Sequence, residues 1–487
     1  MPADVVVIGC GVAALAAAVT AAEGGAKVVL VERAPRDERG GNSRYTSAWM
    51  RMQSEDEICG DLVELLLERG HGAIPPEFVK DAARDYDNWP NNLRAFPFND
   101  PELISALAEN APPTMAWLKS HGIKFTFYSP MLLETGSVRM GPVGGGLALV
   151  ETLADAAERL GVEMMYETTA RGLVLNERGG AAGLRCWSKA RGLFTIDADA
   201  VVVASGGFQG NVEMMTRYVG HNAHFARPVS AGGIYNKGEG LEMMLAAGAA
   251  PAGQYDMFHA APIDPRSERA EALVGIVNFG ILVNNQGKRF VDEGTNRYEL
   301  FYDEASWTVM RQKMGLAYLI FDGDLFNIPH VRTRIQTDQE PLRATSVADL
   351  AAKIGVPQAT LEQTIRSYNA ATGAGEFDIA RLDGLSTHDL APPKSNWARP
   401  IDEGDLYAYP IMCGTTFTCG GVKITKDAEV VNRDGEPIPG LFAAGETAGL
   451  YYNLYVGATS VLRGLVFGRQ AGRKVAQARG SKGRAAA

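Results

Sequence analysis

The chain opens with Asp-Val-Val-Val-Ile-Gly-Cys-Gly-Val-Ala-Ala at residues 4–14, an apolar run that leads into a Gly-x-Gly-x-x-Ala turn. The apolar run predicts a buried parallel strand, and the alanine-rich segment from about residue 12 to 23 predicts a helix. Gly9 permits a tight turn, Gly11 lets a pyrophosphate approach the backbone, and Ala14 lets the helix pack close to the strand. The positive N-terminus of this helix then points at the phosphates.

A second apolar strand at residues 26–32 ends in Glu32, which follows Gly11 by 21 residues. An acidic residue at this distance accepts hydrogen bonds from the ribose hydroxyls of an adenosine. A glycine motif alone also occurs in turns of unrelated α/β proteins. Here the strand before the motif, the helix after it and the acid at the end of the second strand together predict dinucleotide binding.

The composition is that of an ordinary globular protein, and it narrows the classes of function. A chain of 487 residues is too long for one core, so two domains are expected. The net charge of −10 argues against nucleic acid as a partner. No apolar run approaches the roughly 18 residues that span a bilayer, and no signal peptide is evident. The 5 cysteines show no Cys-x-x-Cys spacing, which favours a cytoplasmic protein with reduced thiols and no metal site.

Further glycine-rich stretches follow. Residues 39–46, Arg-Gly-Gly-Asn-Ser-Arg-Tyr-Thr, make a loop that can lie against a flat or phosphorylated ligand, or else a plain surface turn. Apolar strands at 198–204 and 438–444 each run into glycine. Other helices are expected at about 56–72, 76–89, 101–120, 147–160 and 460–479, and a helix pair at 345–371. Other strands are expected at 163–166, 170–175, 280–284, 407–410 and 420–424, and a hairpin turn at 432–435.

These glycine-terminated strands are similar to those of one known family. The fingerprint at 4–32, Ala-Ser-Gly-Gly at 204–207 and Pro-Gly-Leu-Phe-Ala-Ala-Gly-Glu at 439–446 resemble the fumarate reductase/succinate dehydrogenase flavoprotein superfamily, which includes 3-ketosteroid dehydrogenases. Within it, the closest resemblance is to the tricarballylate dehydrogenases. The shared stretches are 39–43, 396–402, 414–418 and 467–472.

The resemblance implies an α/β fold with a Rossmann-like FAD-binding domain that is split in sequence by an inserted α+β capping domain. The FAD-binding domain would take residues 1–250 and 395–479, and the cap residues 251–394. Residues 480–487 would be a disordered tail. The flavin would lie at the interface, where the cap can close over a small-molecule substrate.

The resemblance also assigns residues to the cofactor. Non-covalent FAD is expected, because the loop after Gly41 lacks the histidine through which some members attach it. The N-terminus of the last helix would stabilise the anionic reduced flavin, or would simply be packed. The predicted FAD-binding residues are Gly9, Gly11, Val12, Ala13, Ala14, Glu32, Arg33, Gly40, Gly41, Asn42, Ser43, Ala170, Ala204, Gly206, Gly207, Gly445, Glu446, Gly457, Ser460 and Leu462.

The reaction implied is hydride exchange between the flavin and a carbon, with a side chain exchanging a proton at the neighbouring carbon. In fumarate reductases this side chain is an arginine after a Gly-x-Arg-Phe-x-x-Glu pattern. Arg297 matches that spacing, with Glu293 or Asp292 as a carboxylate relay; the alternative is a surface arginine on a loop. His259 matches a substrate-binding histidine, or is a packed side chain. Arg399 either binds a substrate carboxylate or caps the nearby strand.

Two contacts that fumarate reductases make with a dicarboxylate are missing. A His-containing motif is replaced by Thr-Phe-Thr at 416–418, and the glycine-rich stretch near Tyr455 has no arginine. Tyr452 and Tyr455 are therefore candidates to polarise a substrate carbonyl, as in 3-ketosteroid dehydrogenases, although each could equally be a core residue. Further aromatic candidates are Tyr45, Trp49, Tyr128 and Tyr451.

Several functions stay open at this point. The first is a tricarballylate-type dehydrogenase whose Arg297, His259 and Arg399 meet carboxylates. The second is a dehydrogenase or ene-reductase of an apolar ketone, with tyrosines around the carbonyl. The third is a flavoprotein subunit that passes electrons to a separate redox partner, and the fourth is an FAD-binding module without activity. An external electron acceptor or donor is expected, because no second nucleotide fingerprint for a nicotinamide is present.

Overall fold

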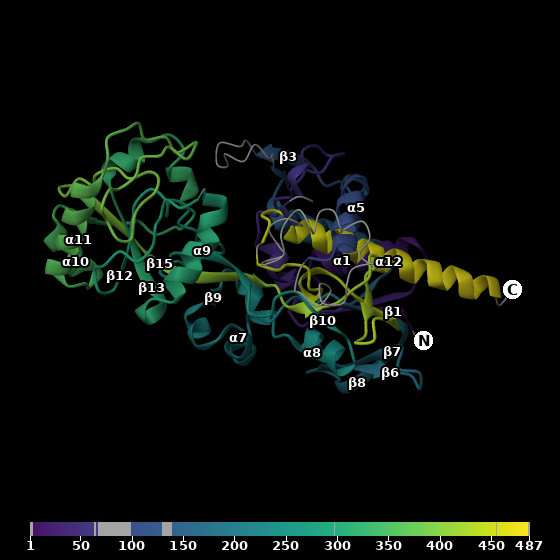
Figure 1. Cartoon of the computed structure of the whole chain (residues 1–487). Coiled ribbons are helices and arrows are strands. Elements are labelled where there is room, and N and C mark those ends of the chain that lie inside the picture. Colours follow the sequence, from purple (N-terminus) through teal and green to yellow (C-terminus); the bar gives the residue numbers. More distant parts are fainter. Residues whose placement is uncertain are drawn as a thin grey trace.

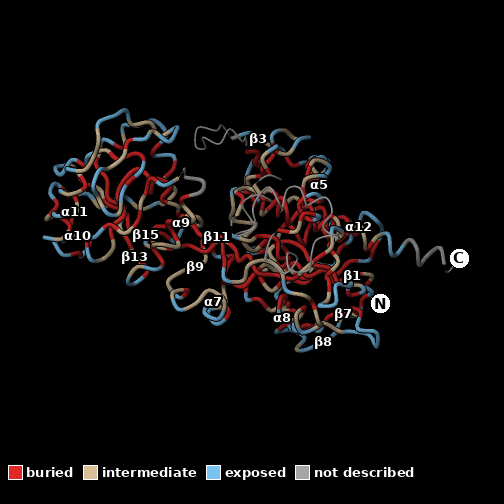
Figure 2. Tube along the Cα trace, viewed as in Figure 1, coloured by how far each residue is buried: buried red, intermediate tan, exposed pale blue. Residues whose placement is uncertain are grey.

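The computed structural model describes residues 3–62, 65–66, 99–128, 139–296, 298–453 and 455–485. Figure 1 shows an elongated molecule of two lobes, and both ends of the chain lie on the same side of the larger lobe. Buried residues fill the centre of each lobe in Figure 2. Each lobe is built on its own β-sheet.

The larger lobe contains an eight-stranded sheet with the central order β17-β18-β8-β1-β2-β5. Its strands are β1 (Ala3–Ile8), β2 (Val28–Val31), β5 (Glu163–Met165), β6 (Thr168–Leu175), β7 (Ala181–Ser188), β8 (Gly192–Val203), β17 (Glu429–Val431) and β18 (Pro437–Ala443). The pairs β1–β2, β1–β8, β8–β18 and β2–β5 are parallel. Residues 5–8 of β1 form a continuous apolar run and are all buried, as expected for a strand that is covered on both faces.

The helix after β1, α1 (Val12–Glu23), packs along α12 (Ser460–Ala485), as the purple and yellow ribbons of Figure 1 show. A Cβ on Gly472 of α12 would lie 2.6 Å from the carbonyl oxygen of Ala17, so the two backbones can approach this closely only because the residue is glycine. α12 continues beyond residue 479, where the last helix was predicted to end, to Ala485.

The smaller lobe contains most of a six-stranded, largely antiparallel sheet with the central order β11-β15-β13-β12. Its strands are β9 (Arg227–Pro228), β11 (Phe258–Ile263), β12 (Ile281–Asn284), β13 (Leu316–Asp322), β14 (Leu342–Ala344) and β15 (Leu406–Thr418). Separate apolar clusters cover this sheet, and α9 (Tyr298–Met310), α10 (Val347–Ile354) and α11 (Gln358–Ala371) contribute to them. The sheet draws on strands outside 251–394, and the predicted domain division stays a prediction.

The remaining elements connect the sheets. The helices are α5 (Pro101–Ser120), α6 (Gly145–Arg159), α7 (Val212–Val219) and α8 (Glu239–Ala246), and the short strands are β3 (Phe125–Tyr128), β4 (Arg139–Pro142), β10 (Pro251–Ala252) and β16 (Gly421–Val422). Short 3-10 helices are η1 (Arg36–Glu38), η2 (Gly41–Arg44), η5 (His221–Phe225), η6 (Ala231–Tyr235), η7 (Lys313–Gly315), η8 (Gly323–Asn327), η9 (Arg332–Arg334) and η10 (Gly445–Thr447).

Most local predictions are confirmed. The helix predicted at 101–120 is α5, and the pair predicted at 345–371 is α10 and α11, with Pro357 at the start of the second. The hairpin turn at 432–435 joins β17 to antiparallel β18. The helix predicted at 76–89, and residues 63–64 and 67–72 of the helix predicted at 56–72, fall outside the described residues. Of the rest of 56–72, residues 56–60 are not helical, and residues 61–62 and 65–66 are. Within the part that the structure describes, none of the helices has the length and apolar character to cross a bilayer.

Candidate active site

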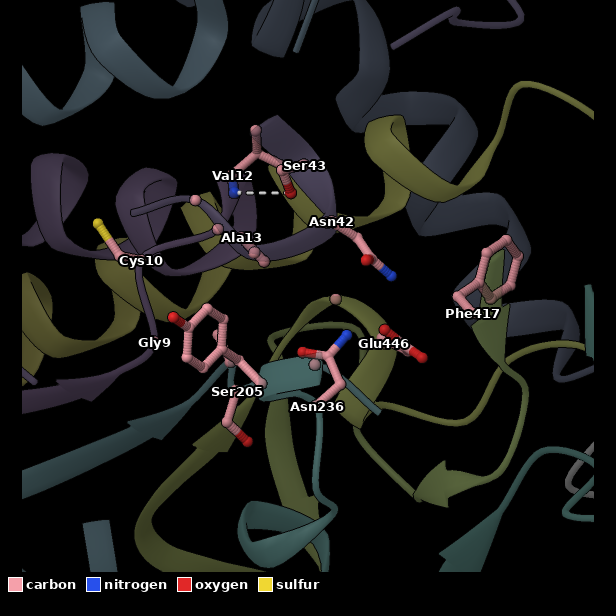
Figure 3. Close-up of a pocket in the computed structure, with 18 of the residues that line it drawn as sticks. Gly9, Cys10, Val12, Ala13, Asn42, Ser43, Ser205, Asn236, Phe417 and Glu446 are labelled. Carbon is pink, nitrogen blue, oxygen red and sulfur yellow. Dashed lines mark hydrogen bonds between the residues drawn. The ribbon is translucent and has the colours of Figure 1, made fainter. Parts of the chain in front are cut away.

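A cavity of about 1290 Å³ opens at the carboxyl ends of β1, β2 and β8, which is the edge where parallel sheets bind ligands. Figure 3 shows Val12 and Ser43 on one side of this cavity, with Asn236 and Glu446 opposite them. Of the predicted cofactor residues, those that line it are Gly9, Gly11, Val12, Ala13, Glu32, Arg33, Gly40, Gly41, Asn42, Ser43, Ala170, Ala204, Gly206, Gly445, Glu446 and Ser460. We call this space the first cavity.

Four predicted cofactor residues do not line the first cavity. Ala14 and Leu462 are completely buried behind it. A Cβ on Gly207 would collide with the side chains of Thr418 and Glu446, so this glycine makes room for the Glu446 carboxylate. Gly457 lines the neighbouring cavity instead.

The fingerprint turn is a backbone cradle. Gly9 has a φ of +105°, and a Cβ there would lie 2.5 Å from the carbonyl oxygen of Ala204. The backbone N–H of Val12, the first residue of α1, donates to Oγ of Ser43 at 3.2 Å, drawn as a dashed line in Figure 3. The loop at 39–46 therefore lies directly against the start of α1. A positive helix end and a Cβ-free turn fit the pyrophosphate of a dinucleotide.

Glu32 lies at the end of β2 with only 8% of its surface exposed. Its Oε1 accepts a hydrogen bond from the backbone N–H of Ala34 at 2.7 Å. Burial raises the pKa of this carboxyl above its ordinary value, and the backbone hydrogen bond from Ala34 opposes the rise. A buried carboxylate with unused acceptor positions is a suitable partner for ribose hydroxyls.

Glu446 accepts hydrogen bonds on the side of the first cavity that lies opposite Val12 and Ser43. Its Oε1 accepts from the backbone N–H of Thr418 at 2.7 Å and from the Thr418 hydroxyl at 3.0 Å. Burial raises the pKa of Glu446, and these bonds oppose the rise. Nearby, Nδ2 of Asn42 donates to the carbonyl oxygen of Thr416 at 2.7 Å, and Ser230 donates to Oδ1 of Asn42 at 3.0 Å. The glycine-rich loop, β15 and the segment after β9 are thus bonded to one another at the cavity.

A second cavity of about 1210 Å³ adjoins the first. The two share lining residues, namely Thr46, Val229, Glu271, Thr416, Phe417, Ser460 and Val461. Of the predicted catalytic residues, His259 and Tyr455 line the second cavity, as does Trp49. A ligand there would lie directly beside whatever occupies the first cavity.

His259, on β11, is held from both ring nitrogens. Nδ1 lies 3.1 Å from Oδ1 of Asp303, and Nε2 lies 2.9 Å from the hydroxyl of Tyr302. Its ring also lies 4.2 Å from that of Tyr455 and 5.3 Å from that of Phe417, centroid to centroid. The histidine therefore lies inside an aromatic wall of the second cavity.

The predicted tyrosines lie in different places relative to the cavities. The Tyr455 hydroxyl donates to Oγ of Ser460 at 3.2 Å, at the start of α12. Tyr452 does not line either cavity, and its hydroxyl accepts from the backbone N–H of Gly253 at 2.7 Å. Tyr451 is fully buried behind Tyr455, with its hydroxyl 2.7 Å from that of Thr459, and burial raises its pKa.

Of the two predicted arginines, only Arg399 lies within the described residues, and it is not brought to the cavities. The Arg399 guanidinium forms an ion pair with Asp322 at the end of β13, and Arg399 lines neither cavity. Arg297 lies outside the described residues. Of its predicted relay carboxylates, Glu293 is fully buried and accepts from Nε of Arg289 at 3.1 Å, while Asp292 accepts from the backbone N–H of Ser395 at 2.9 Å. Both carboxylates thus have structural partners.

Sequence reasoning missed four ionisable residues of the second cavity: Arg139, Glu271, Tyr302 and Arg334. Arg139 opens β4 and Arg334 ends η9, and they are 2% and 7% exposed. Burial raises the pKa of Glu271 to about 7, against hydrogen bonds from Ser47 and Thr46. No motif surrounds these residues, and no signal in the sequence marks them as members of one site.

Comparison with known proteins decides the family. A sequence profile of the FAD binding domain family matches residues 4–461. The chain belongs to this family. It is an FAD-dependent oxidoreductase of the fumarate reductase family, which acts on CH–CH groups and C=C bonds.

The relatives agree with this assignment. A fumarate reductase (cytochrome) of Shewanella frigidimarina is 29% identical, over 97% of this chain and 77% of the relative. A urocanate reductase of Eggerthella lenta is 28% identical, over 97% of this chain and 74% of the relative. Among solved structures, the open conformation of a flavocytochrome c3 fumarate reductase superposes with a TM-score of 0.73 at 26% identity, covering 98% of this chain and 78% of that one.

The fold is also shared with steroid enzymes. The 3-ketosteroid-Δ4-(5α)-dehydrogenase of Rhodococcus jostii has a TM-score of 0.69 at 24% identity, covering 97% of this chain and 96% of that chain. At this level of identity the likeness concerns the fold alone.

Proposed function

We propose that this oxidoreductase moves a hydride between FAD and a CH–CH or C=C bond that lies next to a carboxylate of its substrate. One observation carries this proposal: a cavity with two buried arginines, Arg139 and Arg334, adjoins the cavity that carries the dinucleotide fingerprint. Buried guanidinium groups suit carboxylate ligands, because they form charge-assisted, often bidentate hydrogen bonds.

The first cavity would hold FAD without a covalent bond. The start of α1 and the Gly9 turn would hold the pyrophosphate of FAD, and Glu32 would bind the ribose of its adenosine. Asn42 and Glu446 would contact the middle of the FAD molecule. The cofactor supplies the position that accepts or donates the hydride. The shared lining residues Thr416, Phe417 and Ser460 would stand between the cofactor and the substrate.

On the substrate side, the residues act by binding and orientation. Arg334 lies on η9, which belongs to the smaller lobe. Arg139 lies on β4, which belongs to the larger lobe. A carboxylate between them would fix the substrate to both lobes and so position the reacting carbons. Arg399 and Tyr452 are not part of the proposed site, because neither lines the first or the second cavity.

A tricarballylate-type polycarboxylate is the finer substrate class that we favour. The alternative is an apolar ketone, which the aromatic wall of Trp49, Phe417 and Tyr455 would suit, with tyrosine hydroxyls near the carbonyl. In either case we expect a separate electron donor or acceptor to complete the cycle.

Anaerobic mixing tests the proposal. The FAD-loaded protein would be mixed with tricarballylate, succinate, cyclohexanecarboxylate and cyclohexanone, and bleaching of the visible flavin band would be followed. We expect bleaching by a carboxylate, or reoxidation of the chemically reduced protein by aconitate or fumarate. If the ketone reacts, and no carboxylate reacts or competes with it, the carboxylate assignment is wrong and the apolar ketone is favoured.

A further inference from the structure

We propose that Glu151, on α6, is a positioning residue for FAD. Its carboxylate holds Arg39 and Arg44 on the two sides of the glycine-rich loop at 40–43, and so keeps this loop in the shape that binds the cofactor. The inference rests on the proposed function, because it takes FAD to occupy the first cavity. It assigns a role in cofactor binding to a residue that lines neither cavity.

The loop at 40–43 forms part of the wall of the first cavity. All four of its residues line the cavity, whereas Arg39 and Arg44, which flank the loop, do not. Figure 3 shows Asn42 and Ser43 among the side chains drawn around the cavity. The loop therefore meets a ligand in the first cavity, and the two flanking arginines are left to hold the loop from outside.

Both flanking arginines bind the same carboxylate. Nη2 of Arg39 donates to Oε2 of Glu151 at 2.5 Å, and Nη1 of Arg44 donates to Oε1 of Glu151 at 2.7 Å. Nη1 of Arg44 also donates to the carbonyl oxygen of Arg39 at 3.5 Å. Each oxygen of Glu151 thus takes one arginine, and the two ends of the loop are joined through one side chain.

The loop lies directly on α6, which carries Glu151. A Cβ on Gly40 would lie 2.8 Å from Cγ1 of Val150, and a Cβ on Gly146 would lie 1.8 Å from the carbonyl oxygen of Ser43. The backbone N–H of Gly146 also donates to the carbonyl oxygen of Thr46 at 2.8 Å. Because the loop and α6 are in contact, a side chain of α6 can fix the loop without entering the cavity.

The loop needs contacts of this kind, because its own sequence does not hold it in one shape. Gly40 and Gly41 have φ of +111° and +52°, and two adjacent glycines give the free chain many other conformations. The apparent affinity for a ligand falls with the fraction of the protein that has the binding shape. A clamp that keeps the loop in place therefore strengthens FAD binding without touching FAD.

Arg39 has further partners, and the experiment must separate them from Glu151. Its side chain is 4% exposed. Besides Glu151 it contacts an acidic or phenolic group at three positions, namely Glu158 at 3.3 Å, Asp155 at 3.8 Å and Tyr166 at 2.9 Å. Among the described residues, Glu151 alone bonds to both arginines. Burial opposes ionisation of Glu151, but the hydrogen bonds from Arg39 and Arg44 lower its pKa, so the clamp is charged at neutral pH.

The rate at which FAD leaves the loaded protein tests this role. FAD-loaded protein would be diluted, and the fluorescence of the released flavin would be followed with time. We expect Glu151→Gln and Arg44→Gln each to release FAD about fivefold faster, because a charge-assisted, partly exposed contact is lost. Asp155→Asn is the matched control, since Asp155 lies on the same helix and pairs with Arg39 but does not bond to Arg44.

A double variant distinguishes the proposed contact from a general loss of stability. If Glu151 and Arg44 act through each other, Glu151→Gln combined with Arg44→Gln should release FAD no faster than the more damaging single substitution. The acceleration by Glu151→Gln should also shrink when salt is raised from about 0.1 M to about 1 M, because salt screens the ion pairs of the unmodified protein. Accelerations that multiply in the double variant would overturn the proposal.

Gly9→Ala, measured in parallel, tests whether FAD occupies the first cavity at all. If Gly9→Ala loses FAD while Glu151→Gln retains it as long as Asp155→Asn does, FAD occupies the first cavity and the role of Glu151 is wrong. If Gly9→Ala retains FAD as the unmodified protein does, the proposed placement of FAD fails, and the inference about Glu151 fails with it.

Discussion

The two adjoining cavities are built by different means. The first cavity is shaped mainly by backbone: a turn at Gly9, the start of α1 and strand ends that finish in glycine. The second is shaped by side chains from β4, β11, α9 and η9, which lie far apart in the sequence. The residues of the proposed cofactor site are therefore close together in the sequence, whereas those of the proposed substrate site beside it are not.

The two cavities also differ in how far substitutions of side chains can change their chemistry. Backbone groups present the same donors whatever the surrounding side chains are, so the first cavity suits one cofactor. The second cavity can be given a new polarity by single substitutions, which is consistent with relatives named for fumarate and for urocanate. Four substitutions would break or sharpen this contrast.

The largest effect is expected from Gly9→Ala. The added methyl would meet the carbonyl oxygen of Ala204 at 2.5 Å in a backbone conformation with φ of +105°, so the turn must deform. We expect the purified variant to lack FAD, measured as the ratio of flavin to protein absorbance. Gly179→Ala is the matched control, because its φ is +77° and nothing lies within 4 Å. Equal FAD content in both variants would mean that the turn does not shape the site.

Arg334→Leu should have the next largest effect. Removing a guanidinium that binds a carboxylate costs about 1.5–3 kcal/mol, which raises the half-saturating concentration of a carboxylate substrate by about 10- to 150-fold. Arg139→Leu should act in the same direction. Arg399→Gln is the control, since its guanidinium pairs with Asp322 away from both cavities. If Arg399→Gln raises the half-saturating concentration and Arg334→Leu does not, Arg399 binds the substrate carboxylate, as the sequence resemblance implied.

Glu32→Ala should weaken FAD binding by about 10- to 100-fold, because hydrogen bonds to a charged acceptor are lost. The dissociation constant would be measured by titrating FAD into protein stripped of cofactor. Glu213→Ala, an exposed carboxylate that pairs with Arg217 on α7, serves as the control. Full FAD retention by the Glu32 variant after dialysis would show that the acid does not bind the ribose.

The smallest effect concerns pH. Burial raises the pKa of Glu271 from 4.5 to about 7, so this group is neutral below that pH and anionic above it. Because an anion in the second cavity repels a carboxylate, the half-saturating concentration should rise as pH passes upward through about 7. The folded protein also binds this proton more tightly than the unfolded chain, so the contribution of Glu271 to stability falls between pH 4.5 and 7. Glu271→Gln should flatten both profiles; an unchanged binding profile would remove Glu271 from the substrate site.

The signals that mark the predicted cofactor residues are local in the sequence. The glycine spacing, the acid at the end of β2 and the strands that run into Gly206 and Gly445 each carry their own signal, and most of the assigned residues line one cavity. Ala14 and Leu462 are also among the predicted FAD-binding residues, but both are fully buried and line neither cavity.

The second cavity was largely out of reach of sequence reasoning. Arg139 and Tyr302 come together only because β4 and α9 pack around the same space. Arg399 belongs to a shared stretch, yet it turns toward Asp322 on β13. Sequence patterns place residues on elements, but they do not say which side chains of distant elements meet.

A crystal structure of the FAD-loaded protein with the carboxylate that bleaches it most rapidly, or its unsaturated product, is the most direct test of the account. We expect the ligand to lie in the second cavity, with its carboxylate at about 2.7–2.9 Å from the guanidinium groups of Arg139 and Arg334 and its reacting carbons facing the cofactor. A carboxylate bound at Arg399, or a ligand outside the second cavity, would contradict it.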